Sequence, residues 1–188
     1  MYINCHTYYS LRYGTIKPEE LLSLASENRL KTLALTDINN TSACLDFIRM
    51  SSKYDIKPVV GVDFRNGADQ QFILLAKNNS GFQKINTYLS VFLHNDSLII
   101  PEKPIDIKDS YVIYPFEKGK DYNLKQNEYL GVKPEHLNKL KFSKWNERLD
   151  KLVILRTVSF QNKKGFNTHR LLRAIDNNIC LLYTSDAA

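Results

Sequence analysis

The chain has 188 residues, of which 43% are hydrophobic and 24% are charged. This composition is typical of a globular domain, and it excludes a disordered chain, a collagen-like chain and a disulfide scaffold. Lysine and arginine outnumber aspartate and glutamate by 26 to 20, which gives a formal charge of +6. The whole excess lies after Ala76, because residues 1–76 hold equal numbers of each sign. A basic bias of this size is compatible with a nucleic-acid partner but does not require one.

Cysteine usage and hydropathy indicate where the protein resides. The cysteines, Cys5, Cys44 and Cys180, are odd in number and form no CxxC pair. Since the sequence also shows no secretory signal peptide, we expect a reducing, cytoplasmic environment. No apolar run approaches the roughly 20 residues that a membrane-spanning helix needs, so we expect no association with a membrane.

The first ninety residues alternate between predicted strands and helices. Apolar runs bounded by polar residues predict strands at residues 2–6, 32–37, 57–64 and 72–76. Helical spacing of apolar side chains predicts helices at residues 18–30, 41–53 and 80–92. Pro18, followed by two glutamates, favours the start of the first helix. This order predicts an α/β protein with parallel strands, in which ligand sites gather at the carboxyl ends of the strands.

The pattern weakens after His94, where prolines and lysines indicate loops around a short strand at residues 111–114. Further elements are predicted as a strand at 128–132, a helix at 134–140, a strand at 152–155 and a helix at 166–177. No repeat or low-complexity linker interrupts the chain, so we expect one domain over residues 1–179. Residues 180–188 continue no pattern, which indicates either a non-native tail on a cut reading frame or a frayed terminus.

Three residues at the ends of predicted strands are candidates for chemistry: His6, Asp37 and Asp63. Imidazole and carboxylate together suit zinc, manganese or iron. The alternative is that these side chains cap helices or anchor loops. Cys5 precedes His6, but neighbouring strand residues point to opposite faces, which argues against a Cys–His dyad. The sequence contains no GxSxG, P-loop or GxGxxG pattern.

Several ordered stretches carry a family resemblance: NCHTYYSLRYG, LALTDINN, IKPVVGVDF and ILLAKNNSGFQKI. They resemble the N-terminal PHP (polymerase and histidinol phosphatase) domain of bacterial DNA polymerase III alpha subunits, and the first is most similar to the Bacteroidetes type. FNTHRLLRAIDNN resembles the segment after the last metal motif of that domain, so the resemblance covers residues 1–179. It implies an irregular (β/α)7 barrel at the front of a much longer polymerase.

The resemblance implies that metal-binding members of this family hold a trinuclear centre of His, Asp and Glu ligands. Such a centre supports phosphoester hydrolysis by a metal-activated hydroxide. In some polymerases the domain is associated with exonuclease proofreading. The matched ligand positions that are lost here are Asn4 in the HxH motif, Ile38 in the TDH motif, Gln71 in place of His, and Thr157 and Ser159 in place of Asp-x-His.

His6, Asp37 and Asp63, the last in place of a Glu, are the matched positions that keep ligating groups. Each catalytic ion needs about three protein ligands, so these residues are too few for several ions. The resemblance therefore implies a degenerate barrel with vestigial ligand positions, no catalytic residue and no metal or other cofactor in this fragment.

The leading interpretation is a structural and interaction scaffold within the polymerase alpha subunit. The parent would synthesise DNA with Mg²⁺ held by palm-domain aspartates, and these lie outside this chain. The implied partners are the remainder of the alpha subunit, a proofreading exonuclease subunit and, through the parent, DNA. One alternative is a metal-dependent PHP phosphoesterase, either of the histidinol phosphatase kind or a proofreading 3′–5′ exonuclease. The other is a free-standing basic nucleic-acid module.

Basic segments interspersed with aromatic residues occupy residues 118–125, 139–144 and 163–173. Such segments bind DNA phosphates or another polymerase domain in some proteins, and form solvated, charge-rich faces in others. The candidate contact residues are Lys141, Lys144, Lys163, Lys164, Arg170 and Arg173.

Overall fold

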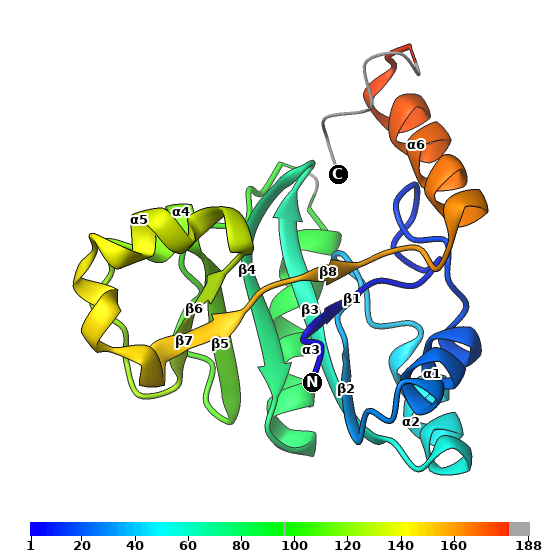
Figure 1. The fold of residues 1–188 in the computed structure, drawn as a ribbon, viewed down its shortest axis with the longest axis horizontal. Coiled ribbons are helices and arrows are strands. Elements are labelled where there is room, and N and C mark those ends of the chain that lie inside the picture. The colour runs from blue at the N-terminus through cyan, green and yellow to red at the C-terminus, as the bar shows by residue number, and fades with distance from the viewer. Residues whose placement is uncertain (96, 181–188) are drawn as a thin grey trace.

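A ring of strands with helices on its outside forms the core of the molecule (Figure 1). The computed structural model describes residues 1–95 and 97–180, so residues 181–188 of the expected tail lie outside the described range. The strands are β1 (Asn4–Cys5), β2 (Thr32–Leu35), β3 (Lys57–Asn66), β4 (Asp69–Ala76), β5 (Ser110–Pro115), β6 (Glu128–Val132), β7 (Leu152–Ile154) and β8 (Thr157–Val158). The α-helices are α1 (Pro18–Glu27), α2 (Cys44–Ser51), α3 (Asn79–Leu93), α4 (Phe116–Gly119), α5 (Leu137–Lys141) and α6 (Lys163–Asn177). Short 3₁₀ turns occupy Ser52–Tyr54, Pro134–His136, Lys144–Glu147 and Leu149–Lys151.

One extended segment, residues 152–158, closes the ring of strands. Six strands form a sheet in the order β2-β3-β4-β5-β6-β7, and β8 pairs separately with β1. Because β7 and β8 are the two halves of this closing segment, its first half pairs with β6 and its second half with β1. The ring is completed between β1 and β2, where Tyr2 bridges Leu33 and the Thr36 N–H donates to the Cys5 carbonyl over 3.0 Å. The expected irregular barrel is therefore confirmed, with β7 and β8 acting as one strand.

The barrel departs from the parallel arrangement expected of its first half. Strand β4 runs antiparallel to both β3 and β5, whereas β2–β3, β5–β6 and β6–β7 are parallel. A tight turn at Gly67, whose φ of +60° suits glycine, joins β3 directly to β4 without a helix. Strand β3 pairs with β2 only as far as Val60. A bridge between Ile38 and Asp63 continues this pairing one step further, and residues 64–72 then form a two-stranded hairpin extension beyond the barrel rim.

Alternating side chains divide the core into an interior and an outer layer. Along β2, Ala34 belongs to the interior cluster, whereas Leu33 and Leu35 pack with the helix pair α1 and α2. Strand β4 alternates in the same way, its outward residues packing against α3. The buried interior cluster contains Ile3, Ala34, Ile73, Leu75, Ile113 and Leu155. Leu155 fits there because Gly131 faces it, where an added Cβ would lie 2.6 Å from Leu155 Cδ2.

Asparagine caps set the starts of two long helices. The Asn78 side chain accepts a hydrogen bond from Gly81 N–H at the start of α3, and Asn162 accepts one from Gly165 N–H at the start of α6. The second cap explains why α6 begins three residues before the predicted start at Phe166. Within the described part of the chain, every helix is too short or too polar to cross a bilayer.

The closing segment offers a test of the assigned interior. Leu155→Ala removes a side chain that is 1% exposed inside the barrel. We expect the free energy of unfolding to fall by about 2–5 kcal/mol, because the truncation loses buried apolar surface and leaves a cavity. Urea denaturation followed by circular dichroism measures the change.

The matched control is Ile154→Ala, at the neighbouring position on the same strand segment, where the side chain is 78% exposed. There we expect a loss of less than about 1 kcal/mol, the span of β-propensity. Equal losses in the two variants would contradict the assignment of Leu155 to the interior.

Candidate functional site

The three retained ligand positions lie at one end of the barrel. His6 follows β1, Asp37 follows β2, and Asp63 lies on β3, where a bridge joins it to Ile38. All three acidic or imidazole side chains are buried. Cys5 points away from them into the outer hydrophobic cluster, which confirms that Cys5 and His6 face opposite sides.

Asp63 is held by three side chains of the fold. Its Oδ2 lies 3.0 Å from His6 Nε2 and accepts from the Arg65 guanidinium, with the Arg65 nitrogens Nε and Nη2 at 3.0 and 2.7 Å. Its Oδ1 accepts from Gln70 Nε2 over 2.8 Å. Asp63 is fully buried and Arg65 is 7% exposed, so this is a buried ion pair. Both carboxylate oxygens therefore have partners from within the chain.

A bulge in the hairpin extension brings these partners to Asp63. The register of β3 against β4 shifts after Phe64, so that Arg65 pairs with Gln70 and Gln71 is the extra residue. Gln71 instead donates to Asp69 and accepts from Lys118 Nζ. The family resemblance assigns position 71 to a ligand, but Gln71 contacts Asp69 and Lys118. The side chain that reaches Asp63 is that of the preceding residue, Gln70.

The electrostatics of Asp63 follow from this arrangement. Burial alone would raise the pKa of the carboxyl group, but the Arg65 guanidinium and the His6 imidazole together hold the pKa of Asp63 below its usual value. The same contact raises the pKa of Arg65 against the effect of its own burial. Asp63 and Arg65 are therefore both charged across the physiological pH range.

Asp37 is held in a separate cluster by the loop after β1. Its Oδ1 accepts from the Thr7 backbone N–H and the Ser10 hydroxyl over 2.6 and 2.7 Å, and its Oδ2 accepts from the Thr7 hydroxyl over 2.8 Å. The loop can fold this tightly because Gly14 lies against the Thr7 carbonyl, where an added Cβ would approach to 1.9 Å. Asp37 thus acts as a loop anchor, the alternative role considered for it.

Neutral side chains fill the positions where ligands are lost. Asn4 Nδ2 donates to Thr157 Oγ1 over 2.9 Å, and Thr36 Oγ1 donates to Asn4 Oδ1 over 3.0 Å. Ser159 Oγ lies 3.4 Å from His6 Nδ1. These contacts link β1 and β2 to the closing segment and its continuation. Asn4 and Thr157, at two of these positions, are therefore satisfied by hydrogen bonds between neutral side chains.

A metal centre does not fit these residues. A cation on Asp63 would have to displace the guanidinium or lie beside it, and like charges repel strongly in a buried site. Of the three retained positions, His6 and Asp63 contact each other, whereas Asp37 is bound to Thr7 and Ser10 in a separate cluster. In residues 1–95 and 97–180 no group of three or more His, Cys, Asp or Glu side chains is placed to hold a metal.

The loop after β1 also binds helix α6 through Tyr13. His169 Nδ1 donates to the Tyr13 carbonyl over 2.7 Å. The His169 and Tyr13 rings also pack edge to face, with their centroids 4.8 Å apart. Burial is the main reason that the pKa of His169 lies below its usual value, so the ring is neutral at pH 7. His169 is thus a packing residue that joins α6 to the loop after β1.

The basic residues chosen as contact candidates do not form one surface. Lys141 and Lys144 lie in and after α5, whereas Lys163, Lys164, Arg170 and Arg173 lie on α6. Figure 1 shows these helices at opposite ends of the molecule. Arg173 is buried and donates to Asp176. Sequence reasoning identified neither Arg65 nor Tyr13, although Arg65 stands two residues after Asp63, the spacing that places strand residues on one face.

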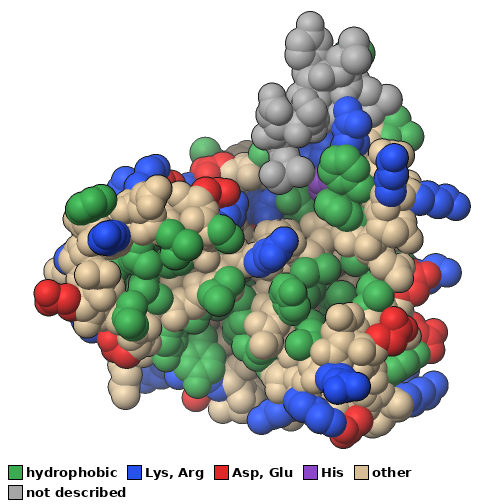
Figure 2. Space-filling view, viewed as in Figure 1, with side chains coloured by type: hydrophobic (Ala, Val, Ile, Leu, Met, Phe, Trp, Pro, Cys, Tyr) green, Lys and Arg blue, Asp and Glu red, His purple; other side chains and the backbone are tan. Residues whose placement is uncertain are grey.

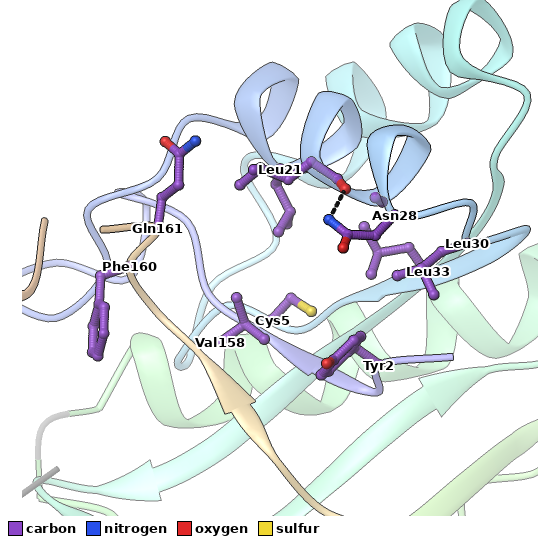
Figure 3. Close-up of a pocket in the computed structure, with 11 residues that line it drawn as sticks. Tyr2, Cys5, Leu21, Asn28, Leu30, Leu33, Val158, Phe160 and Gln161 are labelled. Carbon is purple, nitrogen blue, oxygen red and sulfur yellow. Dashed lines mark hydrogen bonds between the residues drawn. The ribbon is translucent and has the colours of Figure 1, made fainter. Parts of the chain in front are cut away.

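An apolar cavity of about 530 Å³ lies outside the barrel, between α1 and the β1–β8 pair (Figure 3). No charged side chain of the described chain lines it. The Cys5 side chain points toward it in Figure 3, and burial together with the Asp37 charge raises the pKa of the Cys5 thiol to about 12. The thiol is therefore protonated at neutral pH, and this cavity offers no reactive group.

Comparison with known sequences identifies DNA polymerase III alpha subunits among the relatives of this chain. The DNA polymerase III subunit alpha of Ureaplasma parvum is 24% identical over 180 residues, which covers 94% of this chain and 18% of the relative. The subunit of Mycoplasma genitalium is 34% identical over 92 residues, or 46% of this chain and 10% of the relative. The subunit of Escherichia coli K12 is 29% identical over 96 residues, which covers 48% of this chain and 8% of the relative. The chain thus spans less than a fifth of the length of these relatives.

Among solved structures, a protein of Bifidobacterium adolescentis provisionally described as a metal-dependent phosphoesterase matches with a TM-score of 0.39 and 20% identity. The match covers 47% of this chain and 31% of that protein, and similarity at this level carries no conclusion about activity. The PHP domain family matches residues 3–118, which is more than half of the chain and includes His6, Asp37 and Asp63. With the closed ring of strands and the sequence relatives, this match establishes that the chain belongs to the PHP domain family.

Proposed function

We propose that this chain is the N-terminal PHP domain of a DNA polymerase III alpha subunit and that it acts as a metal-independent scaffold. The observation that carries the proposal is the internal pairing of Asp63 with Arg65, His6 and Gln70. A guanidinium occupies the coordination sphere that a metal ion would need. The carboxylate is therefore stabilised by the fold itself, and the domain requires no metal to remain folded.

The proposed partners follow from the relatives named above, which are polymerase alpha subunits that extend far beyond the matched part. The scaffold would pack against the remainder of such a subunit in the cytoplasm. A proofreading exonuclease subunit is the second proposed partner, and DNA would be reached through the parent enzyme. Polymerisation, with Mg²⁺ as its cofactor, belongs to the parent and not to these 188 residues.

Metal content tests the scaffold directly. We expect the purified chain to contain less than one equivalent of zinc, manganese and iron combined, and its melting temperature to be unchanged by EDTA. Inductively coupled plasma mass spectrometry and differential scanning calorimetry measure the two properties. Two or more equivalents of metal, lost in His6→Ala, would instead support the alternative of a PHP phosphoesterase.

The Arg65–Asp63 pair provides a second test. Arg65→Met leaves a buried carboxylate without its main counter-charge, so we expect the free energy of unfolding at pH 7 to fall by about 3–5 kcal/mol. Arg49→Met is the matched control, because Arg49 pairs with Asp46 on the surface, with both side chains more than half exposed. There we expect a loss of about 0–1 kcal/mol in the same urea titration. Comparable losses would show that the buried pair has no special role.

The pH dependence of the stability difference between wild type and Arg65→Met gives a third test. The pKa of Asp63 is lowered in the folded chain, so its contribution to stability is complete above the unfolded value of about 4 and is lost as the pH falls through the folded pKa. Without Arg65, burial raises the pKa of Asp63, and the variant binds a proton where the wild type does not. We therefore expect the gap in melting temperature between wild type and Arg65→Met to narrow as the pH falls from 7 to 3. A gap independent of pH would contradict this account, and Arg49→Met should show no such narrowing.

A further inference from the structure

The outer layer of the barrel has a gap over the closing segment. In a β/α barrel an outer ring of helices covers the strands. Here α1 and α2 pack on β2, α3 packs on β3, β4 and β5, and the lobe that carries α4 and α5 packs on β6. Helix α6, which follows β8, extends beyond the barrel mouth instead of along the ring (Figure 1). In that view no helix of the described chain lies in front of the closing segment.

The outward side of this segment is apolar and exposed. Side chains alternate along extended backbone, so Ile154 and Arg156 point outward where Leu155 points into the barrel. Beside Ile154, a hollow of about 250 Å³ opens between β7 and α5, and its lining includes Val132, Pro134, Leu137, Leu140, Leu152 and Ile154. Figure 2, drawn from the same side, shows hydrophobic side chains across the lobe and the segment beside it. This surface, the hollow together with Ile154 and Arg156, is termed the closing-segment face, and exposed apolar patches of this kind mark interaction sites.

Positive charge surrounds the closing-segment face. Residues 133–158 contain seven lysine or arginine residues and three aspartate or glutamate residues. Arg156 lies on the face itself, and no ion pair among residues 1–95 and 97–180 includes it. A partner that covers Arg156 must supply a carboxylate, because a buried charge without a counter-charge is costly. The face therefore fits an acidic partner.

Two other occupants fit the face less well. In a two-fold contact between copies of this chain, each Arg156 would meet a surface of its own positive sign. Single-stranded nucleic acids bind aromatic rings on which their bases stack, whereas the lining of the hollow includes aliphatic side chains and a proline. A helix whose apolar side chains recur every three or four residues suits an aliphatic hollow, and it would occupy the gap in the outer ring.

We propose that the closing-segment face binds an acidic amphipathic helix from the remainder of the polymerase alpha subunit. Apolar side chains of that helix enter the hollow beside Ile154, and a carboxylate on its flank pairs with Arg156. The helix completes the outer layer between α5 and α1. The inference rests on the proposed function, in which the rest of an alpha subunit packs against this domain.

Fluorescence anisotropy of a labelled peptide with the 188-residue chain tests the proposal. The probe is a synthetic helical peptide of about 18 residues, or about five turns, with leucine every three or four residues on one face and glutamate beside it. A second peptide carries lysine in place of each glutamate. We expect saturable binding of the glutamate peptide and binding of the lysine peptide that is about tenfold weaker or more, because like charges across an interface suppress association.

Two variants of the face identify where the peptide binds. Ile154→Ala should raise the Kd of the glutamate peptide about tenfold, since it removes apolar surface that the helix would bury. Arg156→Glu should reverse the preference between the two peptides. Leu45→Ala and Arg49→Glu, which change exposed residues of α2, are the matched controls and should leave the Kd unchanged.

Absence of saturable binding, equal binding of the two peptides by wild type, or equal effects of Ile154→Ala and Leu45→Ala would overturn the helix site. Displacement of the peptide by an oligothymidylate would assign the face to nucleic acid and overturn it as well. So would a dimer in sedimentation velocity that Ile154→Ala dissociates, which would assign the face to a second copy. Each of these results leaves the metal content and the Arg65–Asp63 pair unchanged, so the scaffold itself stands or falls separately.

Discussion

A carboxylate that water cannot reach must find its counter-charge within the fold, and Asp63 is in that position. Its partners come from the residue after β1, from the far end of β3 and from the facing strand β4. His6 in turn lies against Ser159, which follows the closing segment. This one buried charge therefore fixes the relative positions of the first strand, the hairpin extension and the last part of the barrel. The mouth of the domain keeps its shape because these contacts hold each other in place.

Loss of ligands and retention of architecture are compatible for a physical reason. Several carboxylates gathered without cations would repel one another, so a barrel that no longer binds metal is more stable with neutral groups in their place. Asn4, Thr36 and Thr157 form such a neutral chain of hydrogen bonds. Asp37 is kept, but its oxygens are used by the adjoining loop. The polar groups at this end thus order the backbone through contacts within the fold, as the proposed scaffold role requires.

Much of the fold could be predicted from the sequence because apolar periodicity is a local property. Strands β2, β5 and β6 and helix α3 lie within a few residues of their predicted positions. The antiparallel direction of β4 could not be inferred from alternation alone, since a hairpin and a crossover both separate two apolar runs. The two-residue spacing of Asp63 and Arg65 could have placed both on one strand face. The contact of Gln70 with Asp63 depends on a bulge that shifts the register by one residue, and no composition or spacing rule signals that bulge. The separation of Lys141 from Arg170 is likewise a matter of tertiary path, because both belong to similar basic runs in the sequence.

The closing segment also constrains how the domain is made. Asn4 pairs with Thr157, a partner 153 residues away, so the ring cannot be completed until the closing segment has left the ribosome. Until then β1 and β6 each present an open edge that can pair with another chain. Contacts of such long sequence separation also slow folding, because the chain must close a large loop before the contact can form. The nascent domain is therefore prone to aggregation until β8 has been synthesised and has paired with β1.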